Sequence, residues 1–483
     1  MIPVLFVFAY FLGALAVALM VPAVIAAGIE ETEYVRDFLL TSVLLIFLAG
    51  ALVLSLRGRE RRLRVAQRFW LALLLWMLLP AFAALPVLLI LDNAHPIDAY
   101  FETVSALTTT GARVLAAPEH LPRSLVFWLA LLQWLGGALT LLVVVLVLAP
   151  SGVGGLPETH QRLVEHGGLP ERRRLVMILR DIAPIYVGAT MLCFVLLAFT
   201  GIDPLDALCL AFASVSTGGF APRSEELSAY VPSFGIVVVM LFMVYGATSV
   251  LWHRDIVNAR WAAVRAHRES LWLAALCLGF GLVAALAYFR AAGHAPLLAL
   301  RDGLFTATSL MTTTGLEVRY ASFEVLPLTL VLTVMAVGAA AFSTGGGIKL
   351  FRLGAMLVQA GRELTRLVYP HSIRPARYGS QEYDIQIMKA IWSGALVFVA
   401  GALALSWIIA AEGIAYEGSA LAALAILSNA GPVYSSDWAV GQEWLSYAQM
   451  SYATKVALSA GMILGRLEIL AAIAIIVFAR RRG

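Results

Sequence analysis

The chain has 483 residues, of which 61% are hydrophobic and 13% are charged, and 34 Lys and Arg against 30 Asp and Glu give a net charge of +4. Soluble domains contain about 45–50% apolar and about 25% charged residues, so this composition excludes a soluble globular protein and indicates an integral membrane protein. The charge is too small to argue for nucleic-acid binding, and three cysteines without CxxC spacing indicate no disulfide framework.

Residues 1–66 are predicted to form two leading transmembrane helices. Met1 to about Ala27 is apolar but lacks the basic start and cleavage site of a signal peptide, so we interpret it as a retained helix. A second apolar run from about Phe38 to Leu56 is followed by six arginines within residues 57–68. Because basic segments stay on the cytoplasmic side, this cluster places the end of the second helix in the cytoplasm.

From there one pattern occurs four times: a long apolar helix, a shorter and more polar segment, and a second long apolar helix. The repeats are predicted over 67–180, 181–268, 269–384 and 385–483. Their long helices are expected near 70–92 and 124–149, 182–200 and 232–252, 271–290 and 326–350, and 387–411 and 449–479. Loops between repeats are rich in arginine, so each short segment must enter from outside and return there. We therefore predict an all-α polytopic protein of about ten spans, with both termini cytoplasmic and four re-entrant pore loops in a pseudo-fourfold arrangement around one pore.

The four short segments align on a glycine. The aligned residues are Thr109, Thr110 and Gly111; Thr217, Gly218 and Gly219; Thr313, Thr314 and Gly315; and Asn429, Ala430 and Gly431. Asp98, Asp206 and Asp302 lie thirteen residues before their glycines, and Glu417 lies one residue further away. An acidic residue at a helix N-cap or first turn is stabilised by the helix dipole, so each segment is predicted to be a half-helix about 15 Å long that reaches the middle of the membrane.

Half-helices ending at one point would aim four partly negative carbonyl ends at it and stabilise a cation there. Glycine allows the backbone to turn its carbonyls inward, and such irregular backbone is tolerated at membrane depth where it lines a cavity. Carbonyl and hydroxyl oxygens without a ring of carboxylates favour a monovalent alkali cation over Mg²⁺ or Ca²⁺. A single segment of this kind could equally be a Gly-terminated helix followed by an ordinary loop; four in register predict an ion-selectivity filter.

Two features interrupt the long helices. Gly345, Gly346 and Gly347, followed by Lys349, weaken the second helix of repeat three and predict a mobile gating loop near 343–349, with a close-packing site or a helix end as the alternatives. Arg466 lies inside the last helix and is predicted to form an electrostatic barrier below the filter. The alternatives are a buried pair with Glu468 or another acidic group, or an assembly contact. Lys455 is expected to snorkel toward the surface.

No motif indicates an enzyme. The eight histidines show no metal-ligand spacing, and HExxH, GxSxG and Walker patterns are absent from the sequence, so we expect neither catalytic residues nor an organic cofactor. The competing hypothesis is a secondary transporter that moves another solute by alternating access, which would need a charged binding pocket at the midplane. The sequence instead repeats pore loops and has few intramembrane acidic residues.

At these residues the chain resembles the Trk/Ktr/HKT superfamily of potassium transporters, and within it the TrkH family. The resemblance covers essentially the whole chain and rests on Leu107 to Ala112, Leu121 to Ser124, Gln133 to Gly137, Ser216 to Phe220, Thr312 to Gly315, Ser343 to Lys349 and Gly465 to Ile469. It implies potassium uptake through one pore per subunit in a homodimer of the bacterial inner membrane. It also implies gating by a cytosolic, nucleotide-binding ring of the TrkA type, with Gly345 to Gly347 in a gating loop and Arg466 on the inner side of the filter. Glycine at all four filter positions is linked in that superfamily with potassium preference.

Overall fold

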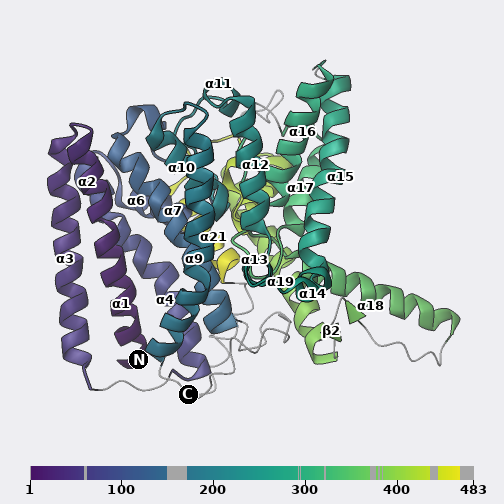
Figure 1. Cartoon of the computed structure of the whole chain (residues 1–483), viewed down its shortest axis with the longest axis horizontal. Helices are drawn as coiled ribbons and strands as arrows, with labels where there is room; N and C mark the ends of the chain where they lie inside the picture. The colour runs from purple at the N-terminus through teal and green to yellow at the C-terminus, as the bar shows by residue number, and fades with distance from the viewer. Residues whose placement is uncertain are drawn as a thin grey trace.

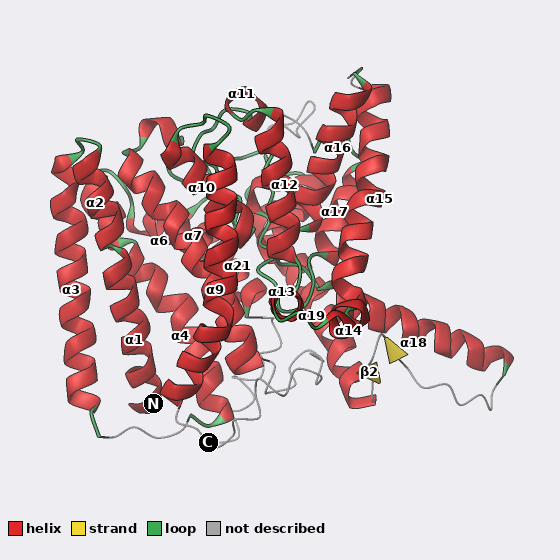
Figure 2. Ribbon diagram, in the orientation of Figure 1, coloured by secondary structure: helices red, strands yellow, loops and turns green. Residues whose placement is uncertain are grey.

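The computed structural model describes residues 2–58, 63–148, 171–291, 293, 295–319, 323–369, 377–378, 381–382, 385–435 and 444–467. Helices make up nearly all of the regular structure in these ranges (Figure 2). The exception is a short antiparallel hairpin of two strands with two residues each, β1 (Arg377–Tyr378) and β2 (Gln381–Glu382). The prediction of an all-α membrane protein is therefore confirmed.

The leading helices form a unit at one side of the molecule. They are α1 (Ile2–Ala18), α2 (Met20–Gly28) and α3 (Thr32–Leu56), and α3 packs along α1 and α2 (Figure 1). The Ser42 hydroxyl donates a hydrogen bond to the Ala16 carbonyl at 2.7 Å in this contact. At the α2–α3 turn the Glu31 carboxylate accepts from the backbone N–H groups of Arg123 and Ser124 at 2.7 and 3.0 Å. The carboxylate thereby caps the helix that begins at Arg123 and attaches the leading unit to repeat one.

Repeat one has the predicted order of long helix, half-helix and long helix. Its elements are α4 (Val65–Ala83), α5 (Leu85–Ile90), the half-helix α6 (Pro96–Leu107), the 3₁₀ turn η1 (Pro118–His120), α7 (Arg123–Val143) and the π-helical turn η2 (Val144–Leu148). Proline at the first helical position of α6 suits a helix start, because its missing N–H would have no intrahelical partner there. α6 packs between α4 and α7.

Repeat two differs from the prediction in its second long helix. Its elements are α9 (Glu171–Ala198), the half-helix α10 (Pro204–Ser216), α11 (Leu227–Tyr230), α12 (Ser233–Ala247), α13 (Val250–Val257) and α14 (Trp261–Ala266). The expected continuous helix over 232–252 is wrong, because the chain bends by 101° between α12 and α13. The residues at the bend hydrogen-bond to a segment of repeat three, which replaces the lost helical bonds.

Repeats three and four complete the molecule. Their elements are α15 (Arg268–Ala291), the half-helix α16 (Pro296–Met311), α17 (Leu328–Val337), α18 (Leu350–Val368), α19 (Ile385–Ala410), the half-helix α20 (Tyr416–Leu427), the 3₁₀ turn η6 (Gly431–Val433) and α21 (Tyr452–Arg466). The helix expected over 326–350 ends at Val337, so residues 338–349 cross the interior without helical structure. After this segment α18 leaves the body sideways, at the same end as α13 and α14 (Figure 1).

Among the described residues, helix length and composition identify fewer membrane-spanning helices than the ten spans that we predicted. The described residues contain seven sufficiently long apolar helices, or eight when the bent pair α12 and α13 is taken as one span. α17 is too short because the chain unwinds after it, and the part of the last predicted helix beyond residue 467 lies outside the described residues. The half-helices α10 and α20 are apolar but too short to span.

Candidate ion pathway

The four half-helices end in the same backbone turn. Thr109, Thr217, Thr313 and Asn429 are left-handed, with φ of 53°, 53°, 60° and 54°. In each case the next residue donates its N–H to the carbonyl five residues earlier, at 2.7 to 3.0 Å. This is the Schellman pattern, which normally has glycine at the left-handed position. A β-branched threonine there costs about 1–3 kcal/mol, and such strain persists where the surrounding structure imposes it, commonly at functional sites.

Glycines of the long helices let three of these ends approach closely. A Cβ on Gly136 of α7 would lie 1.8 Å from the Leu107 carbonyl oxygen. On Gly246 of α12 it would lie 2.4 Å from the Val215 oxygen, and on Gly465 of α21 it would lie 2.3 Å from the Leu427 oxygen. Each carbonyl belongs to the residue two positions before the left-handed one, so in all three repeats a glycine of a long helix packs against the equivalent carbonyl of the half-helix.

The glycines predicted to form the filter lie close to one residue, Pro432. A Cβ on Gly111, Gly219 or Gly315 would lie 2.9 to 3.0 Å from the ring of Pro432, although the three glycines come from different repeats. The fourth repeat reaches the same place, because the Gly431 N–H donates to the Thr110 carbonyl at 2.7 Å. Four segments that are far apart in sequence therefore lie close together at Pro432.

The threonine and asparagine side chains just below the glycines are fully buried. The hydroxyls of Thr108 and Thr110 lie 2.7 Å apart, and those of Thr312 and Thr314 lie 2.8 Å apart. Asn429 connects repeats one and four, since its amide donates to the Thr110 hydroxyl at 2.8 Å and to the Met462 carbonyl at 3.1 Å. Together with the Arg466 guanidinium described below, these carbonyl, hydroxyl and amide groups are among the polar atoms that the described residues place at this depth.

The non-helical segment of repeat three lies against the ends of the half-helices. We call residues 338–349 the intramembrane loop. Its Gly346 N–H donates to the Thr313 hydroxyl at 2.7 Å, and its Thr344 hydroxyl donates to the Val215 carbonyl at 3.2 Å. A Cβ on Gly346 would lie 1.8 Å from the Ser428 carbonyl oxygen. The loop therefore contacts the ends of α10, α16 and α20 at once.

Arg466 joins the loop to the remaining half-helix. Its guanidinium donates to the Thr108 carbonyl and the Thr109 hydroxyl on one side and to the Thr344 carbonyl on the other, the last at 2.5 Å. Only 5% of the residue is exposed. Glu468, the alternative partner considered from the sequence, lies outside the described residues. Lys349 donates to the Gly345 carbonyl within the loop.

Ion pairs hold the outer ends of the half-helices. Asp206 of α10 pairs with Arg223 at 2.7 Å, and Asp302 of α16 pairs with Arg319 at 2.9 Å, both across seventeen residues. Asp98 of α6 pairs with Lys455 at 2.6 Å. With a side chain only 4% exposed, Lys455 does not snorkel as expected.

The predicted position of the acidic residues is only partly right. Asp98, Asp206 and Glu417 lie in the first turns of their half-helices. Asp302 does not, because α16 begins at Pro296 and is one turn longer at its start, so the placement at an N-cap or first turn is wrong there. Its buried carboxylate is held by Arg301 and Arg319 instead of by helix N–H groups.

Sequence reasoning missed two buried glutamates that hold the chain near this axis. The Glu102 carboxylate accepts from the N–H groups of Val114 and Leu115 at 2.8 and 3.2 Å, just after Gly111. Glu269 accepts from the N–H of Ala341 at 2.7 Å in the intramembrane loop. Neither residue repeats at an equivalent position in the other repeats, so the alignment gave no signal for them.

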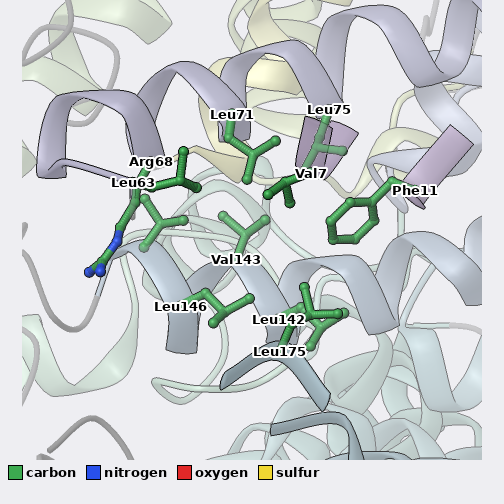
Figure 3. Close-up of a pocket in the computed structure, with 11 residues that line it drawn as sticks. Val7, Phe11, Leu63, Arg68, Leu71, Leu75, Leu142, Val143, Leu146 and Leu175 are labelled. Atoms are coloured by element: carbon green, nitrogen blue, oxygen red, sulfur yellow. The ribbon is translucent and has the colours of Figure 1, made fainter. Parts of the chain in front are cut away.

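A cavity of about 410 Å³, which we call the outer cavity, adjoins the glycines. Gly111, Gly219, Gly315, Gly431 and Pro432 line it together with charged residues of the loops that follow the half-helices. A second crevice, lined by Val7, Phe11 and nine other residues of which only Arg68 is charged, measures about 30 Å³ (Figure 3). That volume holds no more than a water or two. The cavity at the glycines is much larger and is the one of these two that reaches them.

The fold and this site define a polytopic membrane protein in which four half-helices, each followed by the same backbone turn, end close together, preceded by two membrane-crossing segments. The chain belongs to the TrkH family, whose model is described as "Cation transport protein" and matches residues 35–480. It is 28% identical to the Trk system potassium uptake protein TrkH of Vibrio parahaemolyticus over 477 residues, which cover 95% of this chain and 94% of the relative. It is also 28% identical to TrkH of Escherichia coli K12 over 426 residues, covering 86% and 85%. The crystal structure of the potassium transporter TrkH from V. parahaemolyticus superposes with a TM-score of 0.84 at 25% identity, covering 98% of both chains.

Proposed function

We propose that this protein takes up potassium across the bacterial inner membrane through a channel-like filter. The observation that carries the proposal is the meeting of four identically turned half-helix ends around one axis. Helix carbonyl ends carry about half a negative charge each, so four of them stabilise a dehydrated cation without a carboxylate. The relatives named as potassium uptake proteins support potassium as that cation.

The proposed filter consists of residues 108–112, 216–220, 312–316 and 428–432. Backbone carbonyls at these positions would replace the water around the ion. The left-handed residue in each segment redirects the backbone after the half-helix, and glycine two positions later leaves room for its neighbours, as the Cβ distances to Pro432 indicate. The outer cavity would collect hydrated ions before they enter.

The intramembrane loop and Arg466 are the proposed gate. The loop lies on three half-helix ends, and Arg466 connects it to the fourth. A guanidinium at this depth also repels a cation electrostatically. Passage from the filter to the cytoplasm would therefore require both the loop and the Arg466 side chain to move.

The proposal includes partners outside this chain. The relatives are components of a Trk system, which supports regulation by other subunits. From the family resemblance we infer a homodimer surrounded by membrane lipid and gated by a cytosolic TrkA-type ring. The arginine-rich loops between repeats support cytoplasmic termini and a cytoplasmic docking face.

Tracer rubidium uptake into liposomes that contain the purified protein tests this function. With an outward potassium gradient as the driving force, we expect uptake that external potassium competes strongly and external sodium competes weakly. Equal competition by both ions would refute the potassium-selective filter. Because the gate is expected to be closed without its partner, the assay is repeated after deletion of Gly345 to Gly347, and absence of uptake by that folded variant would refute the pore.

A further inference from the structure

Glu269 is a buried carboxylate at the point where α15 enters the membrane from the α14 end of the molecule. One of its oxygens accepts two backbone hydrogen bonds, from Ala341 at 2.7 Å and from Phe351 at 3.1 Å. Only 7% of the residue is exposed. Ala341 lies within the intramembrane loop and Phe351 lies in the first turn of α18, so a single oxygen connects the two sides of the glycine segment.

The same part of the loop is also bound to the bend of repeat two. Ala340 donates its N–H to the Ala247 carbonyl at 3.0 Å, and Val250 donates its N–H to the Phe342 carbonyl at 3.0 Å. The bend itself is joined to α15, because the Ser249 N–H donates to the Ser270 hydroxyl at 3.4 Å. Residues 340–342 are thus held between the α12–α13 bend on one side and the start of α15 on the other.

The two hydrogen bonds that Glu269 accepts differ from the loop's bonds to the α12–α13 bend, because both are lost together when one side chain is changed. Both residues are buried. Ala341 lies in a non-helical segment, and the N–H of Phe351 lies in the first turn of α18, where no preceding turn supplies a carbonyl, so neither donor has a replacement partner nearby. Removal of this carboxylate would therefore leave two buried donors unsatisfied in the closed arrangement and favour any arrangement in which the loop reaches water.

We propose that Glu269 is the positioning residue that holds the intramembrane loop against the half-helix ends. This inference rests on the proposed function of the loop as a gate. Glu269 touches no filter residue in the contacts described above and acts through the backbone of Ala341 and Phe351. Its loss therefore releases the loop while leaving the filter itself intact.

The test compares Glu269→Ala, Glu269→Gln and wild type in the full-length protein in liposomes. Glutamine keeps a carbonyl oxygen at the acceptor position, whereas alanine removes it. Glu31→Ala is the matched control, because Glu31 also accepts two backbone N–H bonds but caps α7 at the opposite end of the molecule. Glu269→Asp retracts the carboxylate by one methylene and replaces the alanine variant if that variant does not fold.

Hydrogen–deuterium exchange of residues 338–352 is the first readout. We expect exchange about tenfold faster or more in Glu269→Ala, a return to within about twofold of wild type in Glu269→Gln, and no change in Glu31→Ala. Unchanged exchange in the folded alanine variant would overturn the proposal, and so would equally fast exchange in the glutamine variant.

Rubidium uptake is the second readout and separates this inference from the proposed function. Faster exchange together with faster, still potassium-selective uptake supports both Glu269 as the residue that holds the loop and the loop as the gate. Faster exchange with unchanged uptake supports Glu269 as the residue that holds the loop and refutes the loop as the gate. Faster uptake without faster exchange at 338–352 overturns the role of Glu269 and leaves the gate in place.

Discussion

Replacement of Gly346 by alanine should open the pathway. Gly346 lies in the intramembrane loop, and an added Cβ would be 1.8 Å from the Ser428 carbonyl oxygen at the end of α20. Real Cβ contacts essentially never fall below 3.0 Å, so the two groups must separate by about 1.2 Å. The Ser428 end is held by consecutive backbone hydrogen bonds of α20, whereas Gly346 belongs to a non-helical segment. We therefore expect the loop to move away from the half-helix.

The size of the effect follows from the cost of overpacking. Extra atoms in a closely packed interior cost about 1–3 kcal/mol. If this cost falls on the closed arrangement alone, the ratio of closed to open protein falls about 5- to 150-fold, because about 1.4 kcal/mol corresponds to a factor of ten. The uptake rate should rise by that factor until nearly all of the protein is open.

Tracer rubidium uptake into liposomes measures this rate. The control is Gly361→Ala in α18, since a Cβ on Gly361 meets no atom within 4 Å, and this variant should behave as wild type. Uptake by folded Gly346→Ala that is equal to or slower than wild type would refute the reasoning that the loop closes the pathway by contact with α20.

Three further changes test other parts of the structure. Gly315→Ser, with its Cβ 2.9 Å from Pro432, should lower potassium over sodium discrimination by about tenfold in competition assays without preventing folding; unchanged selectivity would count against the filter assignment. Glu31→Ala removes the cap of α7 and should destabilise the protein by about 0.5–2 kcal/mol, seen as a lower melting temperature, and an unchanged melting temperature would contradict the capping role. Hydrogen bonds from Ser451 and Thr454 lower the pKa of Glu412 below its usual 4.5, so its contribution to stability is present above pH 4.5 and lost as the pH falls through the folded pKa. Glu412→Gln should accordingly reduce the melting temperature at pH 7, and this effect should shrink as the pH falls below 4.5 and through the folded pKa; an effect that does not change with pH would contradict the role of the ionised carboxylate.

The residues of the candidate site could be found from the sequence because their signals are local. A half-helix ends where its own backbone turns, and the hydrogen bonds of that turn join residues five apart, such as Thr110 and Ser105. A Thr-Gly pattern therefore marks three of the ends, and Asn429 with Gly431 marks the fourth. Proline marks the starts of α6, α10 and α16. The unwinding near Gly346 also has a local cause, although it begins earlier, at Gly338.

Other features depend on how the four repeats close around the axis. The sequence shows Lys455 and Arg466 as isolated charges in an apolar helix, but their partners, Asp98 and the Thr108 carbonyl, lie 357 and 358 residues away. The bend after Ala247 is stabilised by the intramembrane loop of another repeat, so no periodicity within α12 predicts it.

The sequence by itself thus determined that the chain lies in a membrane, that it repeats four times and where each half-helix stops, because apolar length, arginine placement and turn-forming residues act over short distances. Only the tertiary structure decided which charges meet, where the second and third repeats break their helices, and that Glu269 holds the loop. Those outcomes depend on hydrogen bonds between segments that come together only when the repeats surround one axis.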